Sequence, residues 1–257
     1  MDKPIDAVAH SPGLPQVSRV GTLQPLHWLA SGWRDFTANP GPSVTHGLIL
    51  TALGWLILLM CSAQIDLFAA AVSGFLLVGP VFSAGFYELS RRRASGQRAN
   101  FDASLDGALK NGKSLARLGL LLAILAIAWV LTSRLLFVRA LGGTLPSVRE
   151  TFYQTILDWD YYDFFVTYVS TGAVFAAVAF MVSAVSVPII FDRATNVRTA
   201  ILTSIEAVGT NPSAMILWAA LIAMFSAIGF ATLLLGLIIV LPILGHATWH
   251  AYRDLIR

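Results

Sequence analysis

Residues 205–231 read IEAVGTNPSAMILWAALIAMFSAIGFA, a short mixed phrase that ends in Asn-Pro and leads into a long apolar run. The uncharged stretch that starts at Ser213 extends to His250. A bilayer core needs roughly 20 apolar residues per helix, so this stretch is too long for one membrane span and just sufficient for two. It therefore predicts a transmembrane hairpin with a tight turn near residues 226–232.

The composition of the whole chain points in the same direction. Hydrophobic residues make up 56% of the 257 residues and charged residues only 12%, whereas about a quarter of the residues of a soluble domain are charged. We therefore expect an all-α membrane protein with six transmembrane helices. The six predicted spans run over residues 44–63, 67–86, 115–137, 164–191, 213–228 and 229–249.

The phrase that precedes the hairpin occurs twice more, as WRDFTANP at residues 33–40 and LDGALKNG at residues 105–112. Around each copy, apolar residues recur at i, i+4 and i+7, which is the spacing of an amphipathic helix. Such helices, each directly before a span, are predicted to lie in the cytoplasmic membrane interface. Asn tolerates left-handed backbone geometry, and Pro or Gly separates one helix from the next. The predicted hinge residues are Asn39, Pro40, Asn111, Gly112, Asn211 and Pro212.

Every second span carries one proline near its cytoplasmic end, namely Pro80, Pro188 and Pro242, and each is a predicted kink. Together with the repeated phrase, these prolines predict three parallel pseudo-repeated hairpins over residues 24–93, 97–193 and 196–257. The hairpins are expected to form one six-helix domain, residues 24–257. Residues 1–23, which begin with a segment rich in Pro, Ser and Gly, are expected to be a disordered cytoplasmic tail.

The distribution of basic residues predicts the orientation. Of the 17 Lys and Arg residues, only Arg134, Arg139 and Arg149 fall on the side opposite the termini in this topology. The positive-inside rule then places both termini in the cytoplasm. The net charge of +3 mainly reflects this asymmetry and gives no indication of nucleic-acid binding. A basic cluster on the cytoplasmic side is a candidate site for anionic lipid headgroups: Arg91, Arg92, Arg93 and Arg98.

The sequence contains few candidate catalytic or ligand-binding residues. The centres of the predicted spans contain no ionisable residue, which disfavours a proton-coupled or sodium-coupled transporter. Three histidines at span ends, His46, His246 and His250, are the candidate ligands for a metal or haem iron, and we interpret them as interfacial side chains without a cofactor. Cys61 is the single cysteine, and the motifs of hydrolases, metalloproteases and phosphate-binding loops are absent. We therefore expect no enzyme activity.

The longest segment on the outer side ends in ILDWDYYDFF, residues 156–165. Its aromatic residues suit a membrane-interface belt. Its carboxylates Asp158, Asp160 and Asp163 form an acidic periplasmic face that a basic partner, such as a soluble cytochrome, would recognise. The alternative interpretation is an aromatic belt with solvated carboxylates.

Three motifs resemble those of a known family: LLVGPVFSAGFYELSRRR at residues 76–93, the segment at 102–110 before the third span, and SVPIIFDR at 186–193. The family is an uncharacterised group of bacterial six-span inner-membrane proteins, catalogued as a domain of unknown function, and some members are labelled as cytochrome c oxidase subunits. The resemblance extends from Trp33 to the C-terminus. It implies a location in the inner membrane of a Gram-negative bacterium and assigns no catalytic residue.

These observations lead to two functional expectations. The first is a non-catalytic membrane subunit or scaffold that packs with lipids and with partner proteins of a larger assembly, for which a cytochrome-oxidase-associated respiratory complex is the candidate. The alternative is a carrier or channel for a small neutral or lipid-like solute, suggested by the three aligned prolines. A collapsed centre would favour the scaffold, and a continuous path lined by Ser and Thr would favour the carrier.

Overall fold

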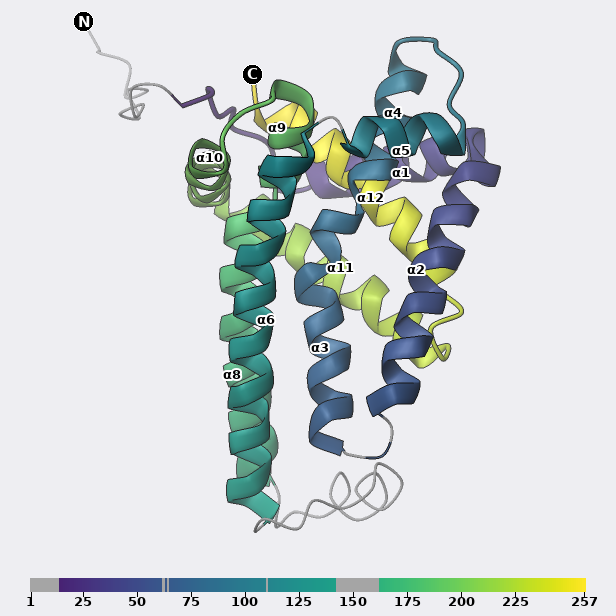
Figure 1. Ribbon diagram of the computed structural model, residues 1–257. Helices are drawn as coiled ribbons and strands as arrows, with labels where there is room; N and C mark the ends of the chain where they lie inside the picture. Colours follow the sequence, from purple (N-terminus) through teal and green to yellow (C-terminus); the bar gives the residue numbers. More distant parts are fainter. Residues whose placement is uncertain (1–13, 62, 64, 110, 142–161) are drawn as a thin grey trace, which may run out of the picture.

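The computed structural model describes residues 14–61, 63, 65–109, 111–141 and 162–257 (Figure 1). Within these ranges the chain is helical, apart from connecting turns and one isolated β-bridge, so the all-helical fold class is confirmed. The helices are α1 (Gln24–Ala38), α2 (Pro40–Cys61), α3 (Ile65–Phe82), α4 (Ala84–Ala94), α5 (Phe101–Leu109), α6 (Gly112–Leu141), α8 (Tyr162–Ser183), α9 (Ser186–Arg193), α10 (Val197–Thr210), α11 (Pro212–Ala231) and α12 (Leu237–Leu255).

Four segments of the described chain are long and apolar enough to cross a membrane. They are α2, Gly112–Ala140 of α6, the segment Tyr162–Arg193 that holds α8 and α9, and α11. Each coincides with one of the predicted spans. The other two predicted spans, residues 67–86 and 229–249, fall mainly on α3 and α12. That these two helices also cross the membrane stays a prediction.

The repeated phrase ends a helix at all three of its positions. α1 ends one residue before Asn39, α5 ends shortly before Asn111, and α10 ends one residue before Asn211. Asn39 and Asn211 share nearly the same backbone conformation, with φ of −132° and −125° and ψ of 57° and 51°. The left-handed geometry that we expected there is therefore wrong, because a following proline restricts the preceding residue without requiring positive φ. The grouping into three repeated hairpins stays a prediction.

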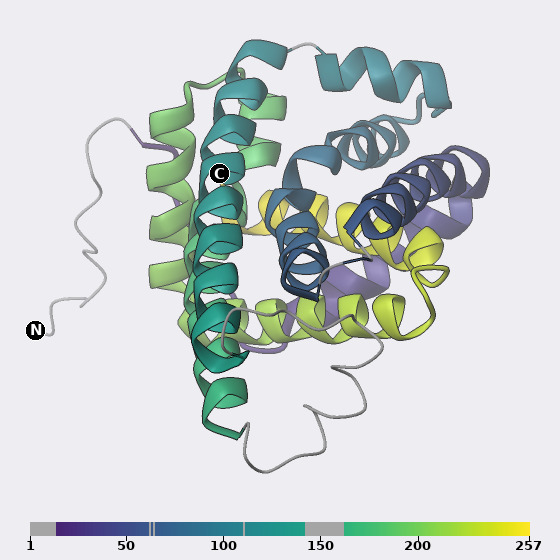
Figure 2. The same ribbon diagram turned by 60° about the horizontal axis from the view of Figure 1, so that its bottom comes forward.

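The long helices α2, α3, α6 and α8 run in similar directions, and the short helices gather at one end of them (Figure 1). α3 packs on α2 and α6, and α6 packs on α8. α11 crosses this group at an angle, as the turned view shows, and α12 returns from it toward the end that holds the short helices (Figure 2). The large apolar side chains Leu56, Leu131, Val174 and Ile216 are more than half exposed on α2, α6, α8 and α11. These are the surfaces expected to face lipid.

The helix at the centre of this arrangement is α12. Twelve of its 19 residues are buried, and it contacts α1, α2, α4, α9 and α11. Two glycines allow neighbouring helices to reach its backbone. A Cβ on Gly32 of α1 would lie 2.6 Å from the carbonyl oxygen of Ile243, and a Cβ on Gly47 of α2 would lie 2.2 Å from that of Ile238. α12 is therefore a core helix, which explains why it can carry polar residues.

The three prolines that were predicted as kinks lie in different local settings. Pro188 is in the first turn of α9, and the preceding helix has already ended at Ser183, as expected because a proline ring clashes with the carbonyl group four residues earlier. Pro80 lies inside α3, three residues before the break at Ser83. Pro242 lies inside α12, which continues through it. A break therefore accompanies Pro80 and Pro188 and not Pro242.

The turn between α11 and α12 lies later than expected. It occupies residues 232–236, whereas the sequence predicted it near 226–232. Leu233 and Leu234 adopt positive φ angles of 53° and 67°, which is unfavourable for residues with a Cβ. The turn is held by the Gly236 N–H, which donates to the Thr232 hydroxyl at 2.8 Å, and by the buried side chain of Leu234. Because leucine is not a typical turn residue, the position of this turn could not be predicted from the residue types.

Part of the predicted tail contacts the C-terminus. Val17 forms an isolated antiparallel bridge with Ile256, and the Ser18 N–H donates to the Leu255 carbonyl at 2.8 Å. The side chain of Asn211 accepts from the Val20 N–H and donates to the Ser18 carbonyl. The expectation of disorder is therefore corrected for residues 17–20, and residues 1–13 lie outside the described ranges.

Candidate functional site

Polar side chains from four helices meet at the end of the bundle where the short helices lie. We call Asp35, Ser43, Ser90, His246 and His250 the polar cluster. They come from α1, α2, α4 and, for both histidines, α12. Asp35 is only 4% exposed, and Ser43 and His246 are fully buried. Such burial is costly unless each polar group finds a partner.

The hydrogen bonds of the polar cluster form a continuous chain from Ser43 through His246 and Ser90 to Asp35, and every donor in it points toward Asp35. The Ser90 hydroxyl donates to Asp35 Oδ2 at 2.5 Å, because a carboxylate can only accept. With its one proton used in this way, the Ser90 hydroxyl accepts from His246 Nδ1 at 2.8 Å. His246 Nε2 then accepts from the Ser43 hydroxyl at 3.0 Å. The chain therefore holds His246 as the neutral tautomer with its proton on Nδ1.

Asp35 is the negatively charged end of this chain. Its Oδ2 also contacts His250 Nε2 at 2.9 Å, and its Oδ1 accepts from the guanidinium of Arg93. Burial by itself would raise the pKa of Asp35, but the hydrogen bonds from His250 and Ser90 outweigh burial and hold the pKa below its usual range. Asp35 is therefore an ionised carboxylate, and its hydrogen bonds link α1 to α4 and α12.

The depressed pKa of Asp35 predicts that the docking of α1 is acid-sensitive. Because the folded-state pKa lies below the ordinary value of 3.8, the stabilisation is fully present above that pH and is lost as the pH falls through the folded pKa. Asp35→Asn should lower stability at neutral pH by about 2–3 kcal/mol, the usual contribution of hydrogen bonds to a charged group. It should also remove this part of the acid-dependent loss. Thermal unfolding in detergent across an acidic pH series measures both effects.

The control for this prediction is Asp102→Asn, since Asp102 is exposed on α5. That variant should keep the acid dependence of the parent protein. The prediction fails when Asp35→Asn and the parent lose stability in parallel on acidification.

The candidate metal or haem ligands are brought near one another but are already hydrogen-bonded. Both ring nitrogens of His246 have partners, and His46 Nε2 lies 2.7 Å from the Ser104 hydroxyl of α5. The ring of Phe86 contacts both imidazoles, with centroid distances of 5.3 Å to His46 and 5.6 Å to His246. Among the described residues, no group of three or more His, Cys, Asp and Glu side chains is arranged to hold a metal ion.

The predicted headgroup cluster is largely engaged in internal ion pairs. Arg91 and Arg92 both contact the buried carboxylate of Glu88, at 2.7 and 2.6 Å. Burial tends to raise the pKa of Glu88, but the hydrogen bonds from Arg91 and Arg92 outweigh burial and lower it. Arg93 contacts Asp35, and Arg98 is exposed in the loop after α4. Since only part of their charge is balanced internally, binding of anionic lipid by these arginines stays a prediction.

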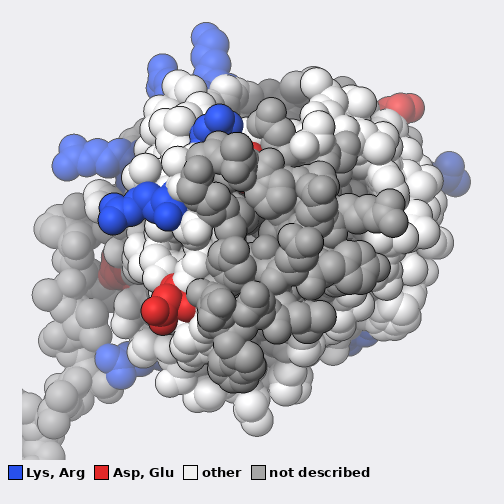
Figure 3. Space-filling view, turned by 90° about the horizontal axis from the view of Figure 1, so that it is seen from below, with Lys and Arg blue, Asp and Glu red and all other residues white. Residues whose placement is uncertain are grey.

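At the opposite end of the bundle, the structure describes only part of the predicted acidic face. Asp158 and Asp160 lie outside the described residues, and Asp163 is exposed in the first turn of α8. The fully buried Asp66 of α3 pairs there with Arg134 of α6 at 3.0 Å. Figure 3 views this end, and the charged side chains that it shows lie near the edge of the face.

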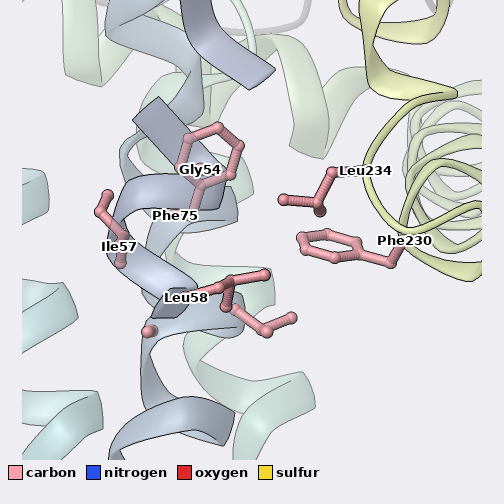
Figure 4. Close-up of a pocket in the computed structure, with 8 residues that line it drawn as sticks. Gly54, Ile57, Leu58, Phe75, Phe230 and Leu234 are labelled. Atoms are coloured by element: carbon pink, nitrogen blue, oxygen red, sulfur yellow. The ribbon is translucent and has the colours of Figure 1, made fainter. Parts of the chain in front are cut away.

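A recess opens between α2, α3 and the α11–α12 turn (Figure 4). Its empty volume, open solvent included, is about 200 Å³. The described residues that line it are all apolar: Gly54, Ile57, Leu58, Ala71, Val72, Phe75, Phe230 and Leu234. Among them there is no Ser or Thr of the kind that a path for a polar solute would need.

Sequence reasoning identified the three histidines but not their surroundings. It treated Asp35 only as part of a repeated phrase, and it did not single out Asp66 or its partner. The signal for Asp35 was present, since it follows the apolar Trp33 by two positions and therefore lies on the opposite side of the helix. What the sequence lacked was the identity of the helix on which that side packs.

The comparisons with known proteins agree with this picture of a helical membrane protein. The sequence model of a family described as "Predicted integral membrane protein (DUF2189)" matches residues 67–192, from α3 to α9. No curated protein and no solved structure matches the chain. The matched residues include the motifs at 76–93 and 102–110 on which the resemblance was based, and all but the last residue of the motif at 186–193. Over this segment, the chain matches the uncharacterised DUF2189 family of predicted integral membrane proteins.

Proposed function

We propose that the protein is a non-catalytic membrane scaffold whose helix α8 binds a partner protein within the bilayer. One face of α8 carries small residues that are exposed: Ser170, Ala173 and Ala177. They are spaced by three and four positions and therefore lie along one side of the helix. Small residues at this spacing let a second membrane helix approach closely.

The opposite side of α8 is already occupied. Gly172 lies against Trp129 of α6, where an added Cβ would be 3.2 Å from the indole ring. Tyr168 and Phe175 contact the same tryptophan, with centroid distances of 5.2 and 5.4 Å. Packing within the chain thus leaves the Ser170 face for another molecule. The same side of α8 also exposes Val166 and Val174, whereas the exposed side of α6 carries the larger Leu120, Ile124 and Leu131.

The polar cluster supports a structural role for the rest of the molecule. Its hydrogen bonds satisfy both nitrogens of His246 and link four helices, so the cluster is suited to fix helix positions. The described lining of the recess between α2, α3 and the α11–α12 turn is apolar, which favours a scaffold over a carrier of a polar solute.

The cellular setting is part of the same proposal. The excess of Lys and Arg on the side of the short helices supports a cytoplasmic location of that side, with the chain in a bacterial inner membrane. The oxidase label of some members of the resembling family makes a respiratory complex the first candidate partner, with this chain as an accessory subunit.

A partner pull-down tests the proposal. The protein is recovered at native expression level in a gentle detergent, and its companions are identified by mass spectrometry and by an optical spectrum. We expect one stoichiometric membrane partner, with haem bands when that partner is respiratory. The variant Ala173→Leu/Ala177→Leu should lose the partner, because larger side chains prevent close approach.

The matched control is Ala116→Leu, an exposed alanine on α6, which should retain the partner. Because all three positions are exposed, the variants should unfold at the same temperature as the parent. Recovery of the parent protein alone, or retention of its partner by the double variant, contradicts the proposal.

A further inference from the structure

In each of the three short helices that precede spans, a polar residue is turned inward and a neighbouring large apolar residue is turned outward, while α1 also buries Trp28 and Phe36. In α1, Asp35 is 4% exposed while Trp33 is 52% exposed. In α5, Ser104 is fully buried while Leu105 is 42% exposed. In α10, Ser204 is fully buried while Ile205 is 42% exposed. A helix on the surface of a soluble protein has the reverse arrangement.

Each inward polar residue has a partner in another part of the bundle. Asp35 contacts His250 of α12, and Ser104 contacts His46 of α2. The Ser204 hydroxyl accepts from the Val185 N–H, at 3.3 Å, in the break between α8 and α9. The orientation of each helix about its own axis is therefore fixed by a polar contact. With each helix in this orientation, its apolar residues Trp33, Leu105 or Ile205 lie on the outward side.

On α1 the outward residues form an extended stripe. Leu23, which directly precedes the helix, is 63% exposed, Leu26 is 46% exposed and Trp33 follows on the same side. The charged or titratable side chains of His27 and Arg34 flank this stripe. An apolar stripe with a tryptophan and flanking basic residues is typical of a helix at a membrane interface.

The outward faces continue into surfaces expected to face lipid. α2 follows α1 after a single residue and exposes Leu48, Ile49 and Leu56. α6 follows α5 and exposes Leu120 and Leu121, and α11 follows α10 and exposes Ile216. In Figure 1 the three short helices lie at one end of the long helices, and α10 is seen along its axis, across their direction.

We infer that the outward faces of α1, α5 and α10, marked by Trp33, Leu105 and Ile205, are embedded in the interface of the adjacent membrane leaflet. The polarity of these helices and their continuity with the exposed sides of α2, α6 and α11 both support lipid as the occupant. The bundle is then held at a fixed depth by three separate anchors, and the polar cluster lies directly behind one of them.

Spin labelling in vesicles of phosphatidylcholine and phosphatidylglycerol tests this inference. Replacing Cys61, the only cysteine, with Ala gives a background in which Trp33→Cys, Leu105→Cys and Ile205→Cys are labelled one at a time. Relaxation by oxygen, which partitions into lipid, is compared with relaxation by a water-soluble nickel chelate. Leu56→Cys on α2 is the lipid reference, and Gln97→Cys in the exposed loop after α4 is the water reference.

We expect the ratio of oxygen to nickel relaxation at all three positions to shift from the water reference toward the lipid reference. His27→Cys on the flank of α1 should lie closer to the water reference. A ratio equal to that of Gln97→Cys at the three positions would show that they face water and would overturn the inference. Protection from both reagents would overturn it too, since it would mean that a second copy or a partner protein covers these faces.

Discussion

Gly47→Ala is expected to destabilise the protein by about 3 kcal/mol, because the added Cβ has no space at the crossing of α2 and α12. The ideal Cβ lies 2.2 Å from the carbonyl oxygen of Ile238 and 2.9 Å from its carbonyl carbon. Both are backbone atoms of the central helix, so no side chain can rotate away. Overpacking typically costs about 1–3 kcal/mol, and the upper end applies where the neighbour cannot yield.

The matched control is Gly41→Ala on the same helix, where no atom of the described residues lies within 4 Å of the added Cβ. This change should be neutral or stabilising by up to about 1 kcal/mol, since alanine favours a helix over glycine. Thermal unfolding of the two variants in the same detergent measures the difference. Gly32→Ala, which meets the backbone of α12 at 2.6 Å, should resemble Gly47→Ala. Equal unfolding temperatures for Gly41→Ala and Gly47→Ala would show that α2 and α12 do not cross in this way.

These glycines mark the limit of what the sequence could predict. The repeated phrase correctly located the ends of α1, α5 and α10, because Asn followed by Pro or Gly interrupts a helix whatever surrounds it. The apolar runs located four membrane-crossing segments in the same way. Both signals are local. The position of α12 at the centre is not local, since it depends on which helices approach Gly32 and Gly47.

The candidate site was also only partly predictable, because the sequence shows local spacing and not which helices pack together. The spacing of His246 and His250 indicated that they lie on one side of a helix, but the contact of His250 with Asp35 joins residues more than 200 positions apart. The stripe of Leu29, Trp33 and Phe36 also misled, because Phe36 is buried while Trp33 is exposed. In a membrane protein, lipid and protein interior are both apolar, so hydropathy alone does not show which side of a helix faces the protein.

Arg134→Ala is expected to have the other large effect, a loss of about 3–5 kcal/mol, because it leaves a buried carboxylate without its counter-charge. Asp66 is fully buried, its Oδ2 accepts from Arg134 at 3.0 Å, and its Oδ1 has no hydrogen-bond partner among the described residues. Arg134 is half exposed, so its guanidinium would stay in contact with solvent if Asp66 were replaced instead. The cost of the substitution therefore falls on Asp66.

A double-mutant cycle separates this loss of pairing from a simple loss of side-chain packing. Asp66→Asn/Arg134→Ala should recover much of the stability lost in Arg134→Ala, because the neutral amide removes the uncompensated charge. Arg139→Ala, an exposed change on the same helix, should cost less than about 1 kcal/mol, as most surface substitutions do. When Arg134→Ala proves as mild as Arg139→Ala, or the double variant is no more stable than Arg134→Ala, the pair does not hold α3 against α6. The expected result would instead show that this ion pair holds α3 against α6 at one end of the bundle. The polar cluster joins α1, α2, α4 and α12 at the other end.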